Sequence, residues 1–184
     1  SGPTGSGKEL VARKIHKNSN RSKNPFIVMN GALLQSDNYE NELFGSENKD
    51  GSISYGFLEK ASNGTLLIDE VSEIPLDTQA KILRVLIDQK FKRINGTKDI
   101  NVNIRIISST SKDLKSEVTM GNFREDLYHR INVVPIEIPK LSSRPDDIPI
   151  LINYFQKKIS EINGIPEIKL NVDEELLYSY DWPG

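Results

Sequence analysis

The stretch Gly-Pro-Thr-Gly-Ser-Gly-Lys-Glu at positions 2–9 decides the fold of this 184-residue chain. It satisfies the spacing G-x-x-x-x-G-K, which is typical of a phosphate-binding loop. Its glycines let backbone N–H groups converge on phosphate oxygens without a Cβ atom in the way. The apolar repeat from Lys8 to Ser19 predicts a helix, whose N-terminus and dipole favour a bound anion. Glu9 stands where Ser or Thr usually helps to hold Mg²⁺, so a plain Gly-rich turn before a helix stays open at this point.

A second element, Thr-Leu-Leu-Ile-Asp-Glu at positions 65–70, is an apolar strand that ends in two acids. Ligands of α/β sheets bind at the ends of strands. Asp69 can bind Mg²⁺, directly or through water, and Glu70 can polarise the water that attacks a γ-phosphate. An ordinary strand followed by solvated acids would look the same in isolation. The two elements in this order favour a nucleotide site.

Further short apolar runs at positions 26–29 and 104–108 predict buried strands beside the strand 65–68. Nearly unbroken apolar strands separated by helices indicate a parallel sheet that is covered by helices on both faces. The remaining predicted elements are a helix from Pro75, a hairpin around Asn95-Gly96, a helix at 123–131 and a strand at 133–138. We therefore expect an α/β nucleotide-binding core over residues 1–139.

The composition changes after this core. Three prolines lie between positions 139 and 149, and the rest reads as helices at 148–159 and 172–180 with a break at Asn163-Gly164. We place a boundary near residue 140 and expect a small helical unit over residues 140–184.

Composition excludes several classes of site. The chain has no cysteine, so it has no disulfide, thiolate zinc site or thiol nucleophile. Its formal net charge of −2 argues against wholesale binding of a nucleic-acid backbone by this segment. No apolar run approaches the roughly 20 residues of a membrane-spanning helix, and we expect a cytoplasmic protein.

Beyond these elements, the chain resembles the AAA+ domain of the bacterial enhancer-binding proteins, the sigma-54-dependent activators. In that family Glu commonly follows the P-loop lysine, as Glu9 does here. The resemblance implies a P-loop NTPase that uses ATP and Mg²⁺, with a helical lid, a strand before Ser1 and a lid that continues beyond Gly184. The matching motifs are the loop and helix at 2–16, ELFG at 42–45, GTLLIDE at 64–70, QAKILRVL at 79–86, FREDLYHR at 123–130, NVVP at 132–135 and DIP at 147–149.

The resemblance also implies roles for single residues. Asn30 matches the polar residue that switches the catalytic glutamate in response to nucleotide, and Thr110 and Ser111 occupy the sensor position. Arg124 and Arg130 match candidate arginine fingers, which reach the ATP site of the neighbouring subunit. The implied catalytic residues are Glu70, Asn30, Arg124 and Arg130, the implied metal ligand is Asp69, and the implied nucleotide contacts are Gly2, Pro3, Thr4, Gly5, Ser6, Gly7, Lys8, Glu9, Asp69, Thr110 and Ser111.

The finger role has a simple alternative. A guanidinium is always charged and matches the geometry of phosphate oxygens, and an arginine supplied in trans contributes about 10³–10⁵ in rate. From the residues alone, however, Arg124 and Arg130 could pair with Glu125 and Asp126 on a solvated helix.

One family motif is absent. The activators carry a Gly-Ala-Phe-Thr-Gly-Ala loop that touches sigma-54, whereas residues 46–55 here read SENKDGSISY, which argues against direct sigma-54 contact. With this loop missing, the chain is most similar to the NtrX-type response regulators. That similarity implies a receiver domain that meets a sensor kinase, a DNA-binding domain after this segment, and a homo-oligomer from dimer to hexameric ring. The expected function is an ATP-binding module of a two-component transcription regulator that oligomerises with ATP. The alternative is a hydrolysis-poor, nucleotide-tuned scaffold for the DNA-binding domain.

Overall fold

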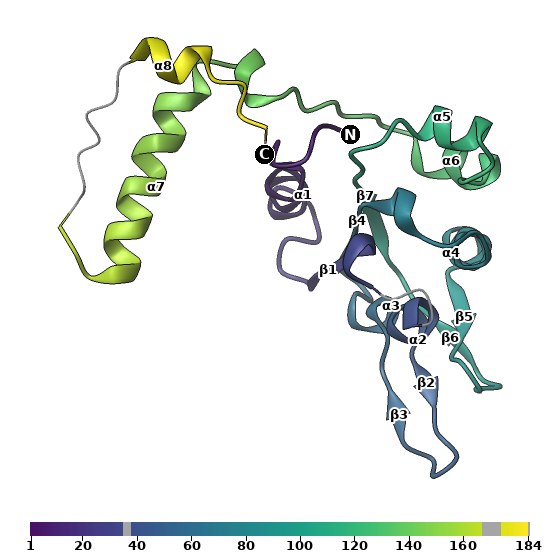
Figure 1. Ribbon diagram of the computed structural model, residues 1–184. Coiled ribbons are helices and arrows are strands. Elements are labelled where there is room, and N and C mark those ends of the chain that lie inside the picture. The colour runs from purple at the N-terminus through teal and green to yellow at the C-terminus, as the bar shows by residue number, and fades with distance from the viewer. Residues whose placement is uncertain (35–37, 167–173, 184) are drawn as a thin grey trace. The chain divides into compact units, whose positions relative to one another are not determined.

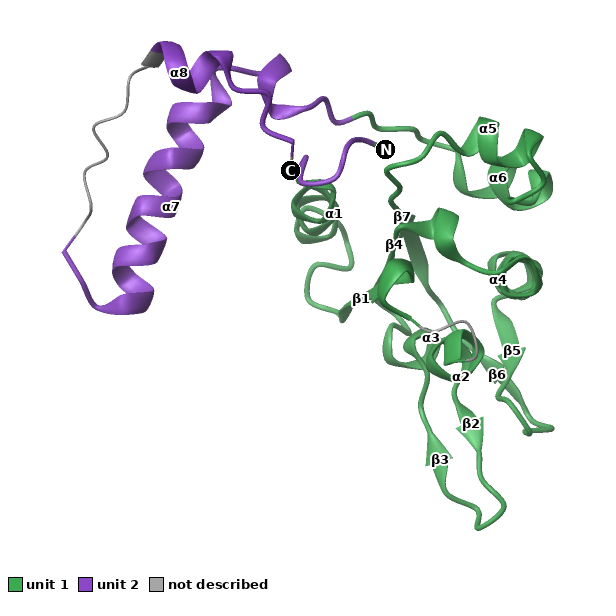
Figure 2. Ribbon diagram, viewed as in Figure 1, with its two compact units in different colours: residues 1, 7–137 green, residues 2–6, 138–184 purple. Residues whose placement is uncertain are grey.

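The computed structural model describes residues 1–34, 38–166 and 174–183 (Figure 1). The chain divides into two compact units (Figure 2). The first comprises Ser1 and Gly7–Glu137, and the second comprises Gly2–Ser6 and Ile138–Gly184. The division therefore falls inside the phosphate-loop sequence, between Ser6 and Gly7.

The first unit is built on a parallel sheet in the order β1-β4-β7. Its strands are β1 (Phe26–Asn30), β4 (Thr65–Asp69) and β7 (Arg105–Ser108). The central strand β4 has no exposed surface at Leu66 or Leu67, as expected for a strand that is covered on both faces. The three predicted strands and their parallel arrangement are confirmed, but only β4 is buried along most of its length, whereas β1 and β7 are mostly half-buried.

Helices flank this sheet, with α1 on one side and α4 on the other in Figure 1. The sheet and helices enclose one apolar core, which includes Met29, Leu43 and Ile82. Two small antiparallel hairpins, β2–β3 and β5–β6, complete the unit, and the second confirms the predicted hairpin around Asn95-Gly96. The bounds are α1 (Lys8–Lys17), η1 (Gly31–Leu33), α2 (Tyr39–Phe44), β2 (Ser46–Glu47), β3 (Ile53–Ser54), α3 (Phe57–Lys60), η3 (Val71–Glu73), α4 (Leu76–Asp88), β5 (Lys90–Lys92), β6 (Asp99–Asn101), α5 (Leu114–Thr119) and α6 (Glu125–Ile131).

The prediction of a strand at positions 133–138 is wrong in this structure. Val133 and Val134 are largely exposed, at 71% and 77%. A strand needs a hydrogen-bonded neighbour, and no strand of the described residues pairs with this segment. The Ser1 amino group does donate to the Ile136 carbonyl oxygen at 2.7 Å, within the same unit.

The second unit is helical in its described part. It contains η4 (Leu141–Ser143), α7 (Asp147–Asn163) and α8 (Glu174–Ser179). Gly164 ends α7 in the left-handed conformation, with φ of 62°, which confirms the predicted break. The predicted helix at 172–180 begins outside the described residues, which resume at position 174. Among the described helices, none is long and apolar enough to span a bilayer.

Candidate nucleotide-binding site

Three strand ends bring polar residues to one edge of the sheet. The parallel register pairs Asn30 with Asp69 and Ile68 with Ser108. The carboxyl ends of β1, β4 and β7 therefore lie side by side, as Figure 1 shows. Glu70 follows β4, and a run of hydroxyl residues, Ser109–Ser111, follows β7. This edge is where an open parallel sheet binds its ligands.

Lys8 and Glu70 form an ion pair beside this edge. Lys8 Nζ lies 3.2 Å from Glu70 Oε1, and the two side chains are only 8% and 16% exposed. The other carboxylate oxygen of Glu70 accepts hydrogen bonds from the amide and the hydroxyl of Ser111, both at 2.9 Å. Burial raises the pKa of Glu70, but the two Ser111 donors and the Lys8 ammonium outweigh it and bring the pKa below its usual value. Glu70 is therefore an ionised carboxylate at neutral pH.

The backbone of Glu70 is held in an uncommon conformation. Its φ of 51° and ψ of 57° lie in the left-handed region, which residues other than glycine rarely adopt. Gly31 packs directly against it, since a Cβ atom on Gly31 would lie 2.6 Å from the Glu70 carbonyl oxygen. Strain of this kind persists where the surroundings determine it, and it clusters at functional sites.

Tyr39 ties together the loops that follow β1 and β4. Its buried hydroxyl donates to the Gly31 carbonyl oxygen and lies 3.2 Å from that of Glu73. Burial, and then the charge of Glu73, raise the pKa of Tyr39, so its hydroxyl stays protonated and remains a donor. The sequence analysis missed Gly31 and Tyr39, because their roles depend on a contact between two loops far apart in the chain.

Asp69 is engaged through both carboxylate oxygens. Ser109 Oγ donates to one, and Asn30 Nδ2 lies 3.5 Å from the other. Asn30 Oδ1 accepts from the Ala32 amide at 2.9 Å and so caps η1. The described hydrogen bonds of Asn30 therefore go to Asp69 and Ala32, although the family resemblance implies a role for Asn30 toward Glu70.

In the segment after β7, hydroxyl side chains at successive positions reach different partners. Ser109 reaches Asp69 and Ser111 reaches Glu70. Between them Thr110 is buried, donates to Ser72 Oγ at 3.1 Å and accepts from the Lys112 amide at 3.0 Å. Side chains two apart in an extended segment share a side. This period could have identified Ser109, which the sequence analysis missed, and it places Thr110 away from the two acids.

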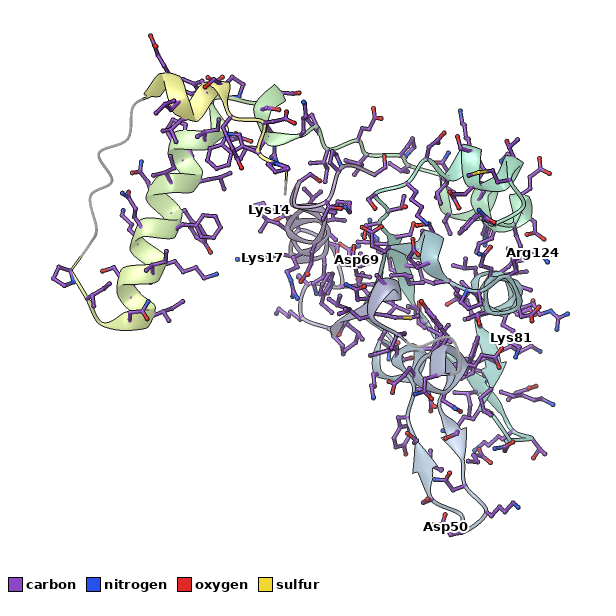
Figure 3. All side chains as sticks on the ribbon, in the orientation of Figure 1. Lys14, Lys17, Asp50, Asp69, Lys81 and Arg124 are labelled. Carbon is purple, nitrogen blue, oxygen red and sulfur yellow. The ribbon has the colours of Figure 1, made fainter. Side chains whose placement is uncertain are left out.

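Asp69 suits a magnesium ion better than Glu9 does. Mg²⁺ prefers oxygen ligands and is usually held by one or two carboxylates together with substrate phosphates and water. Asp69 offers a carboxylate at the strand end, labelled in Figure 3. Glu9 is exposed and pairs with Arg13, with 2.6 Å between the charged atoms. The described residues contain no group of three or more potential protein ligands, so phosphate oxygens and water would have to complete the coordination.

The phosphate loop has the backbone that its glycines predict. Gly5 and Gly7 have φ of 73° and 95°, values that favour glycine. Within the second unit the Ser6 amide donates to the Pro3 carbonyl oxygen at 3.2 Å, which closes a tight turn. Within the first unit Gly7 is the residue that caps α1, and its carbonyl oxygen accepts from Val11. Each part therefore places a turn or a helix start where the motif requires it.

The family described as Sigma-54 interaction domain matches residues 1–137. The chain belongs to the sigma-54 interaction domain family. Over its full length it is 47% identical to the nitrogen assimilation regulatory protein NtrX of Azorhizobium caulinodans and 45% identical to the regulatory protein AtoC of Escherichia coli. It spans 41% of the length of each.

Solved structures of this family have the same fold. Crystal structures of NtrX from Brucella abortus in complex with ATP and with ADP match the whole chain with TM-scores of 0.92 and 0.93, both at 47% identity, and the match covers 42% and 41% of those chains. Hsp104 of S. cerevisiae, in a complex with casein, matches at 21% identity with a TM-score of 0.70 over the whole chain and 36% of its own. That likeness shows the fold alone. The chain is an α/β P-loop domain of the AAA+ type.

The two candidate arginine fingers of this sigma-54 interaction domain differ in their surroundings. Arg124 is exposed and pairs with Asp126, its Nη2 lying 2.7 Å from Oδ2. The backbone amide of Arg124 donates to Oε1 of the fully buried Gln79 at 2.9 Å, which fixes the start of α6. Arg130, also exposed, donates to the Leu86 carbonyl oxygen at 3.1 Å. Figure 3 shows Arg124 far from Asp69, so Arg124 does not face the acids of its own chain.

A hairpin follows the ELFG motif, in the segment where the family resemblance places the sigma-54-contacting loop. β2 and β3 pair through Ser46–Ser54 and Glu47–Ile53, with a polar tip between them. Arg93 clamps the base of this hairpin, because it donates twice to Glu59, at 2.8 and 2.7 Å, and once to Glu47 at 2.9 Å. The tip therefore presents asparagine, lysine, aspartate, glycine and serine at positions 48–52.

Proposed function

We propose that this chain is the ATP-binding AAA+ module of a two-component response regulator that controls transcription, and that ATP drives its oligomerisation. The observation that carries the proposal is the ion pair of Lys8 and Glu70 beside Asp69 at the carboxyl edge of the sheet. NtrX from Brucella abortus, 47% identical, has been solved with ATP and with ADP. This similarity supports binding of both nucleotides by the present chain.

Different residues would bind the phosphates and the magnesium ion. The amides of Gly7 and Lys8 would face the phosphates at the start of α1, where the helix dipole favours them. Lys8 exchanges the Glu70 carboxylate for phosphate oxygens of the β/γ pair. Asp69 would hold Mg²⁺, which when bound supplies positive charge to the phosphate oxygens.

Hydrolysis depends on what Glu70 does after Lys8 leaves it. The carboxylate is ionised and still held by the two Ser111 donors, so it keeps its direction while losing its ammonium partner. In that state it can accept a hydrogen bond from water and polarise it toward the γ-phosphate. Gly31 and Tyr39 hold the backbone that carries this carboxylate.

Oligomerisation would add a side chain from a neighbouring subunit to the site. Arg124, which caps α6, and Arg130, which lies on it, are exposed, and Arg124 lies away from the acids of its own chain. We therefore assign the finger role to one or both in a neighbouring subunit, where a guanidinium stabilises charge on the transferring phosphoryl group. Arg124 must first release Asp126, whereas Arg130 gives up only a backbone carbonyl.

The flanking functions belong to parts outside this chain. We propose that a receiver domain accepts the signal of a sensor kinase and that a separate domain binds DNA. We do not assign direct sigma-54 contact, because the β2–β3 tip is polar where such docking needs an apolar residue.

Nucleotide titration of the intact protein, followed by size analysis, tests this proposal. ATP should bind and shift the protein from a smaller to a larger assembly. If ATP neither binds nor changes assembly, the proposal fails.

One observation favours a second candidate, a hydrolysis-poor scaffold whose assembly responds to bound nucleotide. Glu70 is bound by Lys8 and Ser111, and the described bonds of Asn30 go elsewhere, so the glutamate is not poised for water in this arrangement. Steady-state phosphate release separates the two functions. An ATPase loses release in Glu70→Gln, whereas a scaffold gives the same background level in both proteins.

A further inference from the structure

An arginine at the start of the helical lid contacts the phosphate loop within the second unit. Arg144 Nη2 donates to the Ser6 carbonyl oxygen at 2.6 Å, across 138 positions of sequence. The sequence motifs assigned no role to Arg144. From this contact we infer that Arg144 is a positioning residue that sets the phosphate loop for nucleotide, an inference that rests on the proposed function.

The covalent geometry of the peptide explains the effect. The peptide group between Ser6 and Gly7 is planar, and the described chain has no cis peptide bond. In a trans peptide the carbonyl and the following N–H point in opposite directions. By holding the Ser6 oxygen, Arg144 therefore fixes the direction of the Gly7 N–H, one of the amides that the motif directs at phosphate oxygens. The loop is ordered before nucleotide arrives, which lowers the entropic cost of binding.

Arg144 is itself held by the helix that it precedes. Its Nη1 donates to Asp147 Oδ2 at 3.1 Å, and Asp147 is the first residue of α7. Ile148, the next residue, is only 2% exposed and anchors this turn. One side chain thus links the first turn of α7 to the phosphate loop. A planar guanidinium suits this task, since it donates to two acceptors in fixed directions.

Two buried polar atoms beside this contact lack a partner among the described residues. They are Arg144 Nε and the hydroxyl oxygen of Ser6, and Ser6 is only 5% exposed. Buried polar groups are normally hydrogen-bonded, so unpaired ones at a binding loop indicate capacity for a ligand or its water. The loop therefore has unused hydrogen-bonding capacity next to the peptide that Arg144 orients.

Calorimetric titration of the intact protein with ATP and with ADP tests this role. Arg144→Met keeps most of the aliphatic stem and removes the donors, and it should weaken both affinities about tenfold. Arg144→Lys retains one charged donor and should recover affinity to within about threefold of the parent. The matched control is Lys140→Ala, which removes a cation from the same segment. Lys140 pairs with Asp181, and this variant should bind within about twofold of the parent.

Hydrogen exchange followed by mass spectrometry provides a second readout. In the nucleotide-free protein, the peptide that covers positions 2–9 should exchange faster in Arg144→Met than in the parent and in Lys140→Ala. Parental affinity and parental exchange in a folded Arg144→Met protein would overturn the inference. If that variant does not fold, Asp147→Ala provides the test, because it leaves Arg144 in place and removes the acceptor that anchors it. It should weaken ATP binding about threefold, and an unchanged affinity overturns the inference. A parent that binds no nucleotide refutes the proposed function instead, so the two failures are distinguishable.

Discussion

Two buried ion pairs of the α/β unit have similar exposure but different surroundings. The side chains of Arg93 and Glu59 are 9% and 12% exposed, and those of Lys8 and Glu70 are 8% and 16% exposed. Arg93 makes a planar, two-bond contact with Glu59 and reaches Glu47 with its third nitrogen. Hydrogen bonding to Glu59 is the main cause that raises the pKa of Arg93.

The Lys8 pair joins Nζ to Glu70 Oε1 at 3.2 Å and lies where three parallel strands end. An ammonium is a point charge on a flexible stem, so it can exchange one anion for another, whereas a fork-shaped guanidinium between two carboxylates cannot do so without loss. Burial of charge alone therefore does not indicate a ligand site. Position at the strand ends and an exchangeable geometry do.

The strongest way to break this comparison is Arg93→Met. It leaves Glu47 and Glu59 close together without their counter-charge, and we expect a loss of about 3–5 kcal/mol in the free energy of unfolding. ATP affinity of the folded protein should stay within about twofold. Chemical denaturation and calorimetry measure the two effects. Arg105→Met, at an exposed arginine that starts β7, is the control and should change stability by less than about 0.5 kcal/mol. A large loss of ATP affinity in Arg93→Met would refute the structural role of this clamp.

The two serines after β7 test the Lys8–Glu70 half of this comparison. Ser111→Ala removes one of the two Ser111 donors to Glu70, and we expect phosphate release to fall about tenfold with ATP affinity unchanged.

Ser109→Ala acts on Asp69 instead and should raise the Mg²⁺ concentration that half-maximal release requires. A phosphate-release assay over a magnesium series checks both variants. If they respond alike, the two serines do not serve separate acids.

Tyr39→Phe tests whether the Tyr39 hydroxyl holds together the loops that follow β1 and β4. It removes a buried hydroxyl that joins two loops, and we expect it to destabilise the unit by about 1 kcal/mol and to lower phosphate release several-fold. Tyr154→Phe is the matched control, since Tyr154 is 55% exposed on α7 and should lose almost nothing. Equal stability of Tyr39→Phe and the parent would show that the hydroxyl does not hold the loops.

Glu70→Gln should give the smallest effect when ADP affinity is measured. Glu70 competes with nucleotide phosphates for Lys8, so loss of the Glu70 charge should tighten ADP binding about threefold. Calorimetry with ADP avoids any contribution from hydrolysis. Weaker ADP binding in this variant would mean that Glu70 helps the nucleotide directly.

Local patterns in the sequence were enough to predict much of the fold. Apolar runs predicted the three parallel strands, and Asn95-Gly96 predicted the hairpin, because period and turn chemistry are encoded within a few residues. The segment at 133–138 has the same apolar character but forms no strand. Pairing depends on a neighbour, and apolar character alone does not supply one.

The candidate site was predictable only in part, for a related reason. Motif spacing identified Lys8, Asp69 and Glu70, which the structure brings to one edge. Tyr39 and Arg144 act through backbone carbonyls that lie 34 and 138 positions away, and any residue offers a carbonyl. Such contacts leave no side-chain pattern for a motif to detect.

The most direct test of the central claim is ATP binding by the intact protein with Lys8 changed to Ala, measured by calorimetry beside the parent. If Lys8 at the start of α1 and the acids at the end of β4 hold a triphosphate, the variant should bind ATP at least about 100-fold more weakly while keeping its fold. Parental affinity in a folded Lys8→Ala protein would contradict the account.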